Sequence, residues 1–205
     1  MNKNTRSSLL LRRLLGGSLL MSLVVSGLAT QLRAQDMKVE TIDARAMGTS
    51  TQLGKNVGVQ IRITRFSTDE DRQVLVDAFK KGQNQGLVDA LSKMKPVGRI
   101  AITGTLGYDL SYIRAVPTST GRKIRFVTNR QIRIGEAYNN TQSTAYNLTA
   151  GEIDINDKDK AKNSGVLLPA AQLIINKEGQ LEFDIRKNPW KLVNIIDWNG
   201  AGQPK

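Results

Sequence analysis

The stretch RIAITGTLGYDLSYIRAVPTSTGRKIRFVT, residues 99–128, decides the fold, because short runs of alternating apolar and polar residues follow one another with only tight turns between them. Each run has the two-residue period of a half-buried strand. Turn-forming residues separate the runs at 104–107 and 118–121. Connections this short join antiparallel strands, since parallel strands need a crossover of about a dozen residues or more. The segment therefore predicts an antiparallel sheet.

The same alternation extends on both sides of this stretch. Val57, Val59, Ile61 and Ile63 alternate with more polar residues and predict a first strand. Towards the C-terminus, further strands are expected at 130–135, 144–155, 166–175, 180–186 and 190–197. A succession of strands with short turns is typical of β-sandwiches and barrels.

Residues 67–95 have a helical pattern instead and predict a pair of helices. Ser67 or Thr68 can cap the first helix, with acidic residues three positions later, and basic residues followed by Gly82 suit its end. The second helix carries an apolar stripe that includes Leu87 and Leu91 and should end before a proline. The predicted fold class is α+β, mainly an antiparallel β-sandwich or open barrel with a two-helix insertion after the first strand.

The domain organisation follows from the N-terminus. Residues 1–34 place basic residues before an apolar run of about fifteen residues, a pattern typical of a cleaved secretory signal peptide. The run is shorter than the roughly twenty residues of a transmembrane helix, so we expect no stable membrane span after cleavage. Residues 35–56 lack a sustained period and predict a flexible N-terminal arm. We expect a single β-rich domain over 57–198 and a disordered tail over 199–205. The predicted location is periplasmic or secreted.

Charge and composition restrict the function. The chain has a net charge of +12, and the predicted signal peptide holds five of its 30 Lys and Arg residues and none of its 18 Asp and Glu residues, so 25 − 18 = +7 remains after cleavage. Because the protein is expected to be exported, the sequence predicts no nucleic-acid partner. No histidine or cysteine occurs in the sequence, which excludes Ser-His-Asp and Cys-His catalysis and any zinc site built on these residues. The sequence predicts no cofactor and no metal.

Four segments carry a family resemblance: RFSTDE at 65–70, KPVGRI at 95–100, GTLGYDL at 104–110 and RFVTNR at 125–130. They resemble the signature of an uncharacterised family of exported bacterial proteins, over residues 57–197. The resemblance implies export and a shared fold. Because the family has no assigned activity, ligand or catalytic residue, the resemblance assigns no site.

A group of arginines and aromatic residues is the candidate ligand-binding site, since such residues together bind phosphates, carboxylates and other anions. The residues are Tyr108, Tyr112, Arg114, Arg125, Arg133 and Tyr138. On an alternating strand, the simpler interpretation of these residues is a solvated outer face of the sheet. If they converge, the expected partner is an anionic glycan, a lipid headgroup or an envelope protein.

Two functions remain open from the sequence. The first is an exported, non-catalytic binding or structural domain that recognises an anionic or glycan partner through a basic sheet face. The alternative is a small carboxylate-dependent hydrolase acting on an envelope or extracellular polymer, because a glycosidase needs only two suitably separated acidic groups. Two carboxylates facing each other across a cleft would favour the enzyme.

Overall fold

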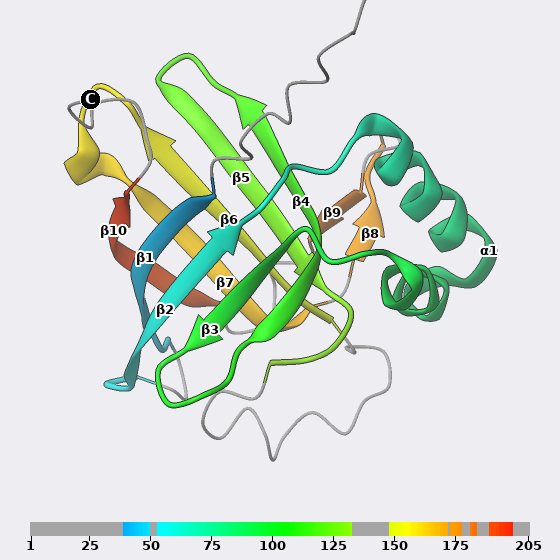
Figure 1. The fold of residues 1–205 in the computed structure, drawn as a ribbon, viewed down its shortest axis with the longest axis horizontal. Helices are drawn as coiled ribbons and strands as arrows, with labels where there is room; N and C mark the ends of the chain where they lie inside the picture. Colours follow the sequence, from blue (N-terminus) through cyan, green and yellow to red (C-terminus); the bar gives the residue numbers. More distant parts are fainter. Residues whose placement is uncertain are drawn as a thin grey trace, which may run out of the picture. The chain divides into compact units, whose positions relative to one another are not determined.

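The computed structural model describes residues 39–49, 53–132, 148–171, 173–177, 181–183 and 189–198. Eight strands form a closed antiparallel barrel, and they follow one another around it in chain order (Figure 1). They are β1 (Glu40–Met47), β2 (Asn56–Ile63), β3 (Gly98–Ile102), β4 (Tyr108–Pro117), β5 (Gly121–Thr128), β6 (Leu148–Asn156), β7 (Ser164–Ala171) and β10 (Trp190–Asp197). Among the described residues, three elements interrupt this meander: helix α1 (Asp69–Lys93) after β2, the 3₁₀ helix η2 (Lys160–Lys162) after β6, and the hairpin of β8 (Leu173–Ile175) and β9 (Leu181–Phe183) after β7.

The predicted sandwich or open barrel with a two-helix insertion after the first strand is wrong. The barrel is closed because β1 pairs with β2 on one side and with β10 on the other. The described residues contain one α-helix, and it follows the second strand of the barrel. The signal peptide predicted at 1–34 and the tail at 199–205 lie outside the described residues.

Strand β1 occupies part of the predicted N-terminal arm, so the arm is wrong for residues 40–47. Ile42, Ala44 and Ala46 are buried in the barrel, while Asp43 and Arg45 alternate with them. Alanine and charged residues are weak strand formers, which hides the alternation in the sequence. Pairing with two neighbouring strands stabilises β1 where local propensity does not.

Helix α1 begins as the sequence predicts. The Thr68 hydroxyl accepts a hydrogen bond from the Asp71 amide at 3.2 Å, and the Asp71 carboxylate accepts one from the Thr68 amide at 3.0 Å, which together form a capping box. The helix ends at Lys93, before Pro96, as expected. Within the described ranges, no helix is both long and apolar enough to cross a membrane.

The middle of α1 is sharply bent, at the position where the sequence suggests a helix end. Gly82 and Gln83 have non-helical backbone angles, and Gln83 has a positive φ of 51°. The bend divides α1 into two arms (Figure 1). A Cβ atom on Gly86 would lie 2.2 Å from the carbonyl oxygen of Ala78, so the two arms approach too closely there for any larger residue.

Side chains fill the barrel interior. Ile61, Ile100, Ile124 and Phe126 are fully buried in one apolar cluster. The Phe126 ring occupies the space above Gly151, where a Cβ atom would lie 2.2 Å from the ring. Barrels of eight strands have an interior wide enough for side chains or one small ligand, and these side chains occupy it here.

A second apolar cluster holds α1 against the outside of the barrel. It joins α1 to the outward-facing residues of β4, β5, β6 and β7 and to β8. The buried members are Leu75, Phe79, Leu87, Leu91, Tyr112, Val127, Leu148, Ala150, Leu168, Ala171 and Leu173. The backbone amide of Leu173 also donates a hydrogen bond to the Asn84 side chain at 3.3 Å, so the hairpin is tied to the second arm of α1.

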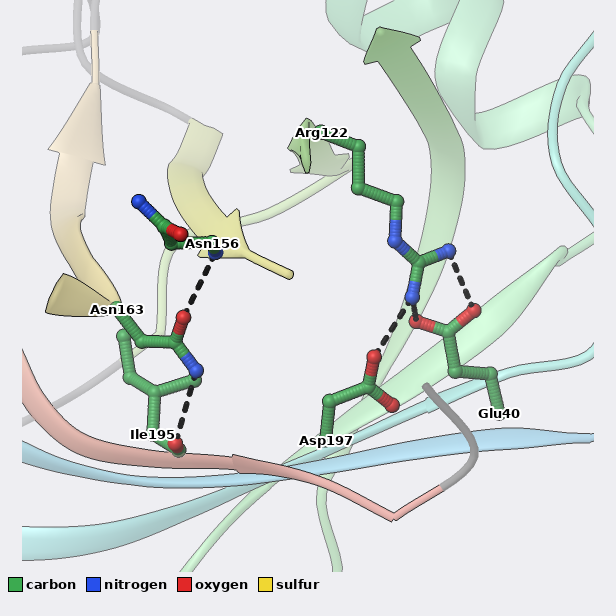
Figure 2. Close-up of polar contacts among 6 residues, drawn as sticks. All are labelled: Glu40, Arg122, Asn156, Asn163, Ile195 and Asp197. Atoms are coloured by element: carbon green, nitrogen blue, oxygen red, sulfur yellow. Dashed lines mark hydrogen bonds and ion pairs between the residues drawn. The ribbon is translucent and has the colours of Figure 1, made fainter. Parts of the chain in front are cut away.

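Inward-facing charged residues cover one end of the barrel (Figure 2). The Arg122 guanidinium donates two hydrogen bonds to Glu40, at 3.1 and 2.8 Å, and one to Asp197 at 2.7 Å. Beside them, the Asn163 side chain accepts from the Asn156 amide at 2.8 Å and donates to the Ile195 carbonyl at 3.3 Å. The Asn163 side chain, directly after η2, therefore contacts β10 at Ile195. This contact lies beyond Leu192, where the described pairing of β10 with β7 stops.

Candidate functional site

A pocket of about 370 Å³ lies between α1 and the outer surface of β4 and β5. Its size falls in the range of small-molecule sites, which is roughly 300–1,000 Å³. Apolar side chains and three arginines line it: Arg72, Leu75, Leu87, Leu91, Tyr112, Arg114, Val116, Arg125, Val127 and Leu173. The pocket therefore combines an apolar wall with cationic groups.

Both arms of α1 contribute to the pocket. Arg72 and Leu75 are three residues apart on the first arm and so share one helix face. Leu87 and Leu91 are four residues apart on the second arm and are both fully buried. The bend at Gly82 and Gln83 allows both faces to contact the same cavity.

The strands contribute the opposite wall through the two-residue alternation of side chains. Tyr112, Arg114 and Val116 occupy alternate positions of β4 and line the pocket together. In the register with β5, Arg114 lies opposite Arg125 and Tyr112 lies opposite Val127. Two like charges are thus placed side by side, which is destabilising unless acidic groups neutralise them.

Two of the three pocket arginines have such acidic partners. Arg114 Nη1 lies 2.9 Å from a carboxylate oxygen of Asp69, and Arg125 Nε donates to Glu152 at 2.7 Å. Arg72 is half-buried, and its side chain pairs with none of the described residues. Three arginines against two carboxylates leave the pocket with a net charge of +1.

The side chains of Arg114 and Tyr112 interact with each other in the pocket wall. Arg114 hydrogen-bonds to the Tyr112 hydroxyl, and its Nη1 lies 2.9 Å from an Asp69 carboxylate oxygen, so both neighbours already engage this guanidinium. Burial raises the pKa of the Tyr112 hydroxyl in spite of the opposing effect of Arg114. Tyr112 therefore stays protonated at neutral pH and keeps its hydrogen-bond donor.

Cross-strand acids neutralise much of the predicted basic face next to the pocket. Lys123 lies 2.9 Å from Glu152 and 3.1 Å from Asp154, and Glu152 also accepts from Arg125. Burial raises the pKa of Glu152, but hydrogen bonds from Lys123 and Arg125 outweigh burial and lower the pKa overall. Within the described ranges, Arg72 is the cation of this region that has no acidic partner.

The structure brings together part of the predicted site. Tyr112, Arg114 and Arg125 line the pocket. Tyr108 does not: it packs against the barrel core, and the Arg130 guanidinium lies 5.0 Å from the centre of its ring. Arg133 and Tyr138, the other two predicted residues, lie outside the described residues.

Sequence reasoning missed the contribution of α1 and β8. The apolar stripe of Leu87 and Leu91 is visible in the sequence, and Arg72 stands one turn before Leu75, but nothing local identifies the strand face that these residues meet. Leu173 has no sequence signal at all, because its position depends on where the hairpin folds back.

A carboxylate-dependent hydrolase needs two acidic groups that are open to a substrate. Glu40 and Asp197 face each other at the barrel end, but Arg122 lies between them and bonds to both (Figure 2). Burial raises the pKa of Glu40 more than Arg122 lowers it. Among the described residues, no group of three or more acidic side chains could hold a metal ion. This carboxylate pair is occupied by a salt bridge rather than open to a substrate.

Comparisons with known proteins add no assignment. No family model matches the chain, so the resemblance to an uncharacterised exported family stays a prediction. No curated protein matches it. No solved structure matches it either.

Proposed function

We propose that this protein is an exported, non-catalytic binding protein whose ligand is an anion held in the pocket between α1 and the β4–β5 surface. The observation that carries the proposal is Arg72, a half-buried residue whose side chain lines the pocket and pairs with none of the described residues. A charged group that is partly removed from water costs free energy unless a counter-charge is present. A bound anion would supply that counter-charge.

Two further features support binding outside the barrel rather than inside it. The interior is packed with side chains such as Phe126 and Trp190, which are at most 2% exposed. The pocket residues, in contrast, come from four elements, α1, β4, β5 and β8, that converge on one cavity. The N-terminal charge pattern of residues 1–34 supports export.

A thermal-unfolding experiment on the full chain tests the proposal. Benzoate, glucuronate and sulfate are each added at constant ionic strength, and the unfolding temperature of the wild type is compared with that of Arg72→Gln. A ligand that binds only the folded state raises this temperature. We expect at least one anion to stabilise the wild type and to lose that effect in Arg72→Gln.

The matched control is Arg62→Gln, since Arg62 is an exposed arginine of β2 that does not line the pocket. It should respond to the anions as the wild type does. If no anion stabilises the wild type more than Arg72→Gln, or if Arg62→Gln loses the same stabilisation, the pocket is not an anion site and the proposal is overturned.

A further inference from the structure

We infer that the anion is the carboxylate head of an alkyl chain, so that the ligand is a medium- or long-chain fatty acid; this inference rests on the proposed function. The lining has two kinds of surface. Six of its residues are aliphatic: Leu75, Leu87, Leu91, Val116, Val127 and Leu173. A free inorganic anion has no apolar part that could cover them, and a glycan offers only the C–H groups of its rings among many hydroxyl groups.

The cationic groups select the head of the ligand. Asp69 and Arg72 belong to the first arm of α1 and are three residues apart, so they share one face of the helix. Since Asp69 contacts Arg114 at 2.9 Å, Arg72 and Arg114 lie at the same end of the pocket. A carboxylate there could accept from the Arg72 side chain, which pairs with none of the described residues, and would also lie near the Arg114 guanidinium, which is paired with Asp69.

The charge of the pocket favours a monoanion. The three lining arginines and their carboxylate partners, Asp69 and Glu152, leave a net charge of +1. A carboxylate neutralises this charge, whereas a phosphate monoester carries about −1.5 to −2 at pH 7 and would leave an uncompensated negative charge. The apolar wall then accommodates the alkyl chain, whose burial supplies most of the affinity.

Isothermal titration of the full chain tests the inference with acetate, octanoate, decanoate, 1-octanol and inorganic phosphate, all below micelle-forming concentrations. Each buried CH₂ group should strengthen binding about fourfold, so decanoate should bind up to about 15-fold more tightly than octanoate. Octanol, which lacks the charge, should bind at least tenfold more weakly than octanoate. Acetate and phosphate should show no measurable binding.

Three variants locate the ligand. Arg72→Gln should weaken decanoate binding about tenfold or more, and Arg62→Gln should leave it unchanged. Val116→Phe places a larger side chain at a half-buried position of the pocket wall and should abolish decanoate binding. Thermal unfolding of each variant shows that it is folded.

The outcomes separate the inference from the proposed function. If acetate or phosphate binds as tightly as decanoate and the binding depends on Arg72, the pocket recognises an anion without its chain, and only the fatty-acid inference is overturned. If decanoate binds but Arg72→Gln and Val116→Phe both leave its affinity unchanged, the ligand lies elsewhere and the inference is overturned. If no anion in either experiment binds, both the inference and the proposed function are overturned.

Discussion

Arg122 on β5 reaches across the end of the barrel to Glu40 on β1, with Nη2 2.8 Å from Oε1 (Figure 2). In the order of strands around the barrel, β5 and β1 are four strands apart in either direction and therefore lie opposite each other. The same guanidinium contacts Asp197 on β10 at 2.7 Å. One side chain thus connects opposite walls of the barrel and covers the apolar interior at this end.

Replacing Arg122 by alanine should strongly destabilise the protein. Glu40 and Asp197 have only 12% and 6% of their side chains exposed, so both would lose their counter-charge while remaining largely buried. Loss of one member of a buried ion pair costs about 3–5 kcal/mol, and we expect the lower part of this range because Arg122 itself is partly exposed. Urea unfolding measures the change.

Arg62→Ala is the matched control for Arg122→Ala, because Arg62 is exposed on β2 and pairs with no described residue. Its effect on the free energy of unfolding should stay within about 0.5 kcal/mol. Equal effects of the two substitutions would contradict the stabilising role of the contacts across the barrel end.

Glu40 and Glu152 should give pH dependences of opposite sign. Burial raises the pKa of Glu40, with Arg122 opposing and Asp197 adding to the shift. A glutamate with a raised pKa in the folded state stabilises the fold below its unfolded pKa of about 4.3, and this stabilisation is lost as the pH rises through the folded pKa. The pKa of Glu152 is lowered overall, so its contribution is present above about pH 4.3 and is lost as the pH falls through the folded pKa.

The measurement compares the free energy of unfolding of the wild type with that of Glu40→Gln and of Glu152→Gln at several pH values around this range. The difference between wild type and Glu40→Gln should fall as the pH rises, and the difference for Glu152→Gln should increase. Differences of the same sign would show that burial and pairing do not act on these two groups as described.

Gly86→Ala should disrupt the contact between the two arms of α1. The added Cβ atom would lie 2.2 Å from the Ala78 carbonyl oxygen, which belongs to the backbone and cannot rotate away. Overpacking of this kind costs about 1–3 kcal/mol. Gly82→Ala is the control, because its Cβ atom would have no neighbour within 4 Å and its φ of −139° is accessible to alanine. Urea unfolding should show a loss for Gly86→Ala alone; equal losses would contradict the close approach of the arms.

Export should remove the N-terminal segment. A fusion of the full chain to alkaline phosphatase, an enzyme that becomes active only outside the cytoplasm, should be active in a bacterial host. The mature protein should begin at Gln35, as N-terminal sequencing can show, because Leu32-Arg33-Ala34 is a suitable cleavage site. Substitution of Arg12 and Arg13 by lysine should leave export intact if the chain crosses the membrane unfolded. An inactive fusion, or a mature protein that still begins at Met1, would contradict the prediction.

Local pattern predicted much of the secondary structure. The capping box at Thr68 and Asp71 and the end of α1 before Pro96 depend on neighbours within a few residues, and both occur as expected. The alternation of residues 57–63 likewise gives β2. The strand predicted at 130–135 is wrong for residues 130–132, which are irregular. Residues 133–135 lie outside the described residues.

The candidate site was only partly predictable, because its two walls are distant in the sequence. Arg114 and Arg125 were singled out from one basic stretch, and their shared position in the pocket follows from the hairpin that places them opposite each other. Arg72 directly follows the residues that cap α1, and helix capping accounts for this segment of the sequence without any ligand. Only the packing of α1 on β4 and β5 gives Arg72 a role at the pocket.

Composition and short-range periodicity are enough to exclude histidine and cysteine chemistry, to give the basic and apolar N-terminal pattern, and to predict most strands and helix ends. Closure of the sheet, in contrast, depends on long-range contacts. Closure requires β1 to pair with β10 through partners such as Ile42 and Asp197, which are more than 150 residues apart. Such long-range pairing is governed by the burial of complementary faces and leaves no local signal in an alanine-rich strand. The pocket between α1 and the barrel wall likewise depends on contacts between residues that are distant in the sequence, so local sequence patterns do not predict it.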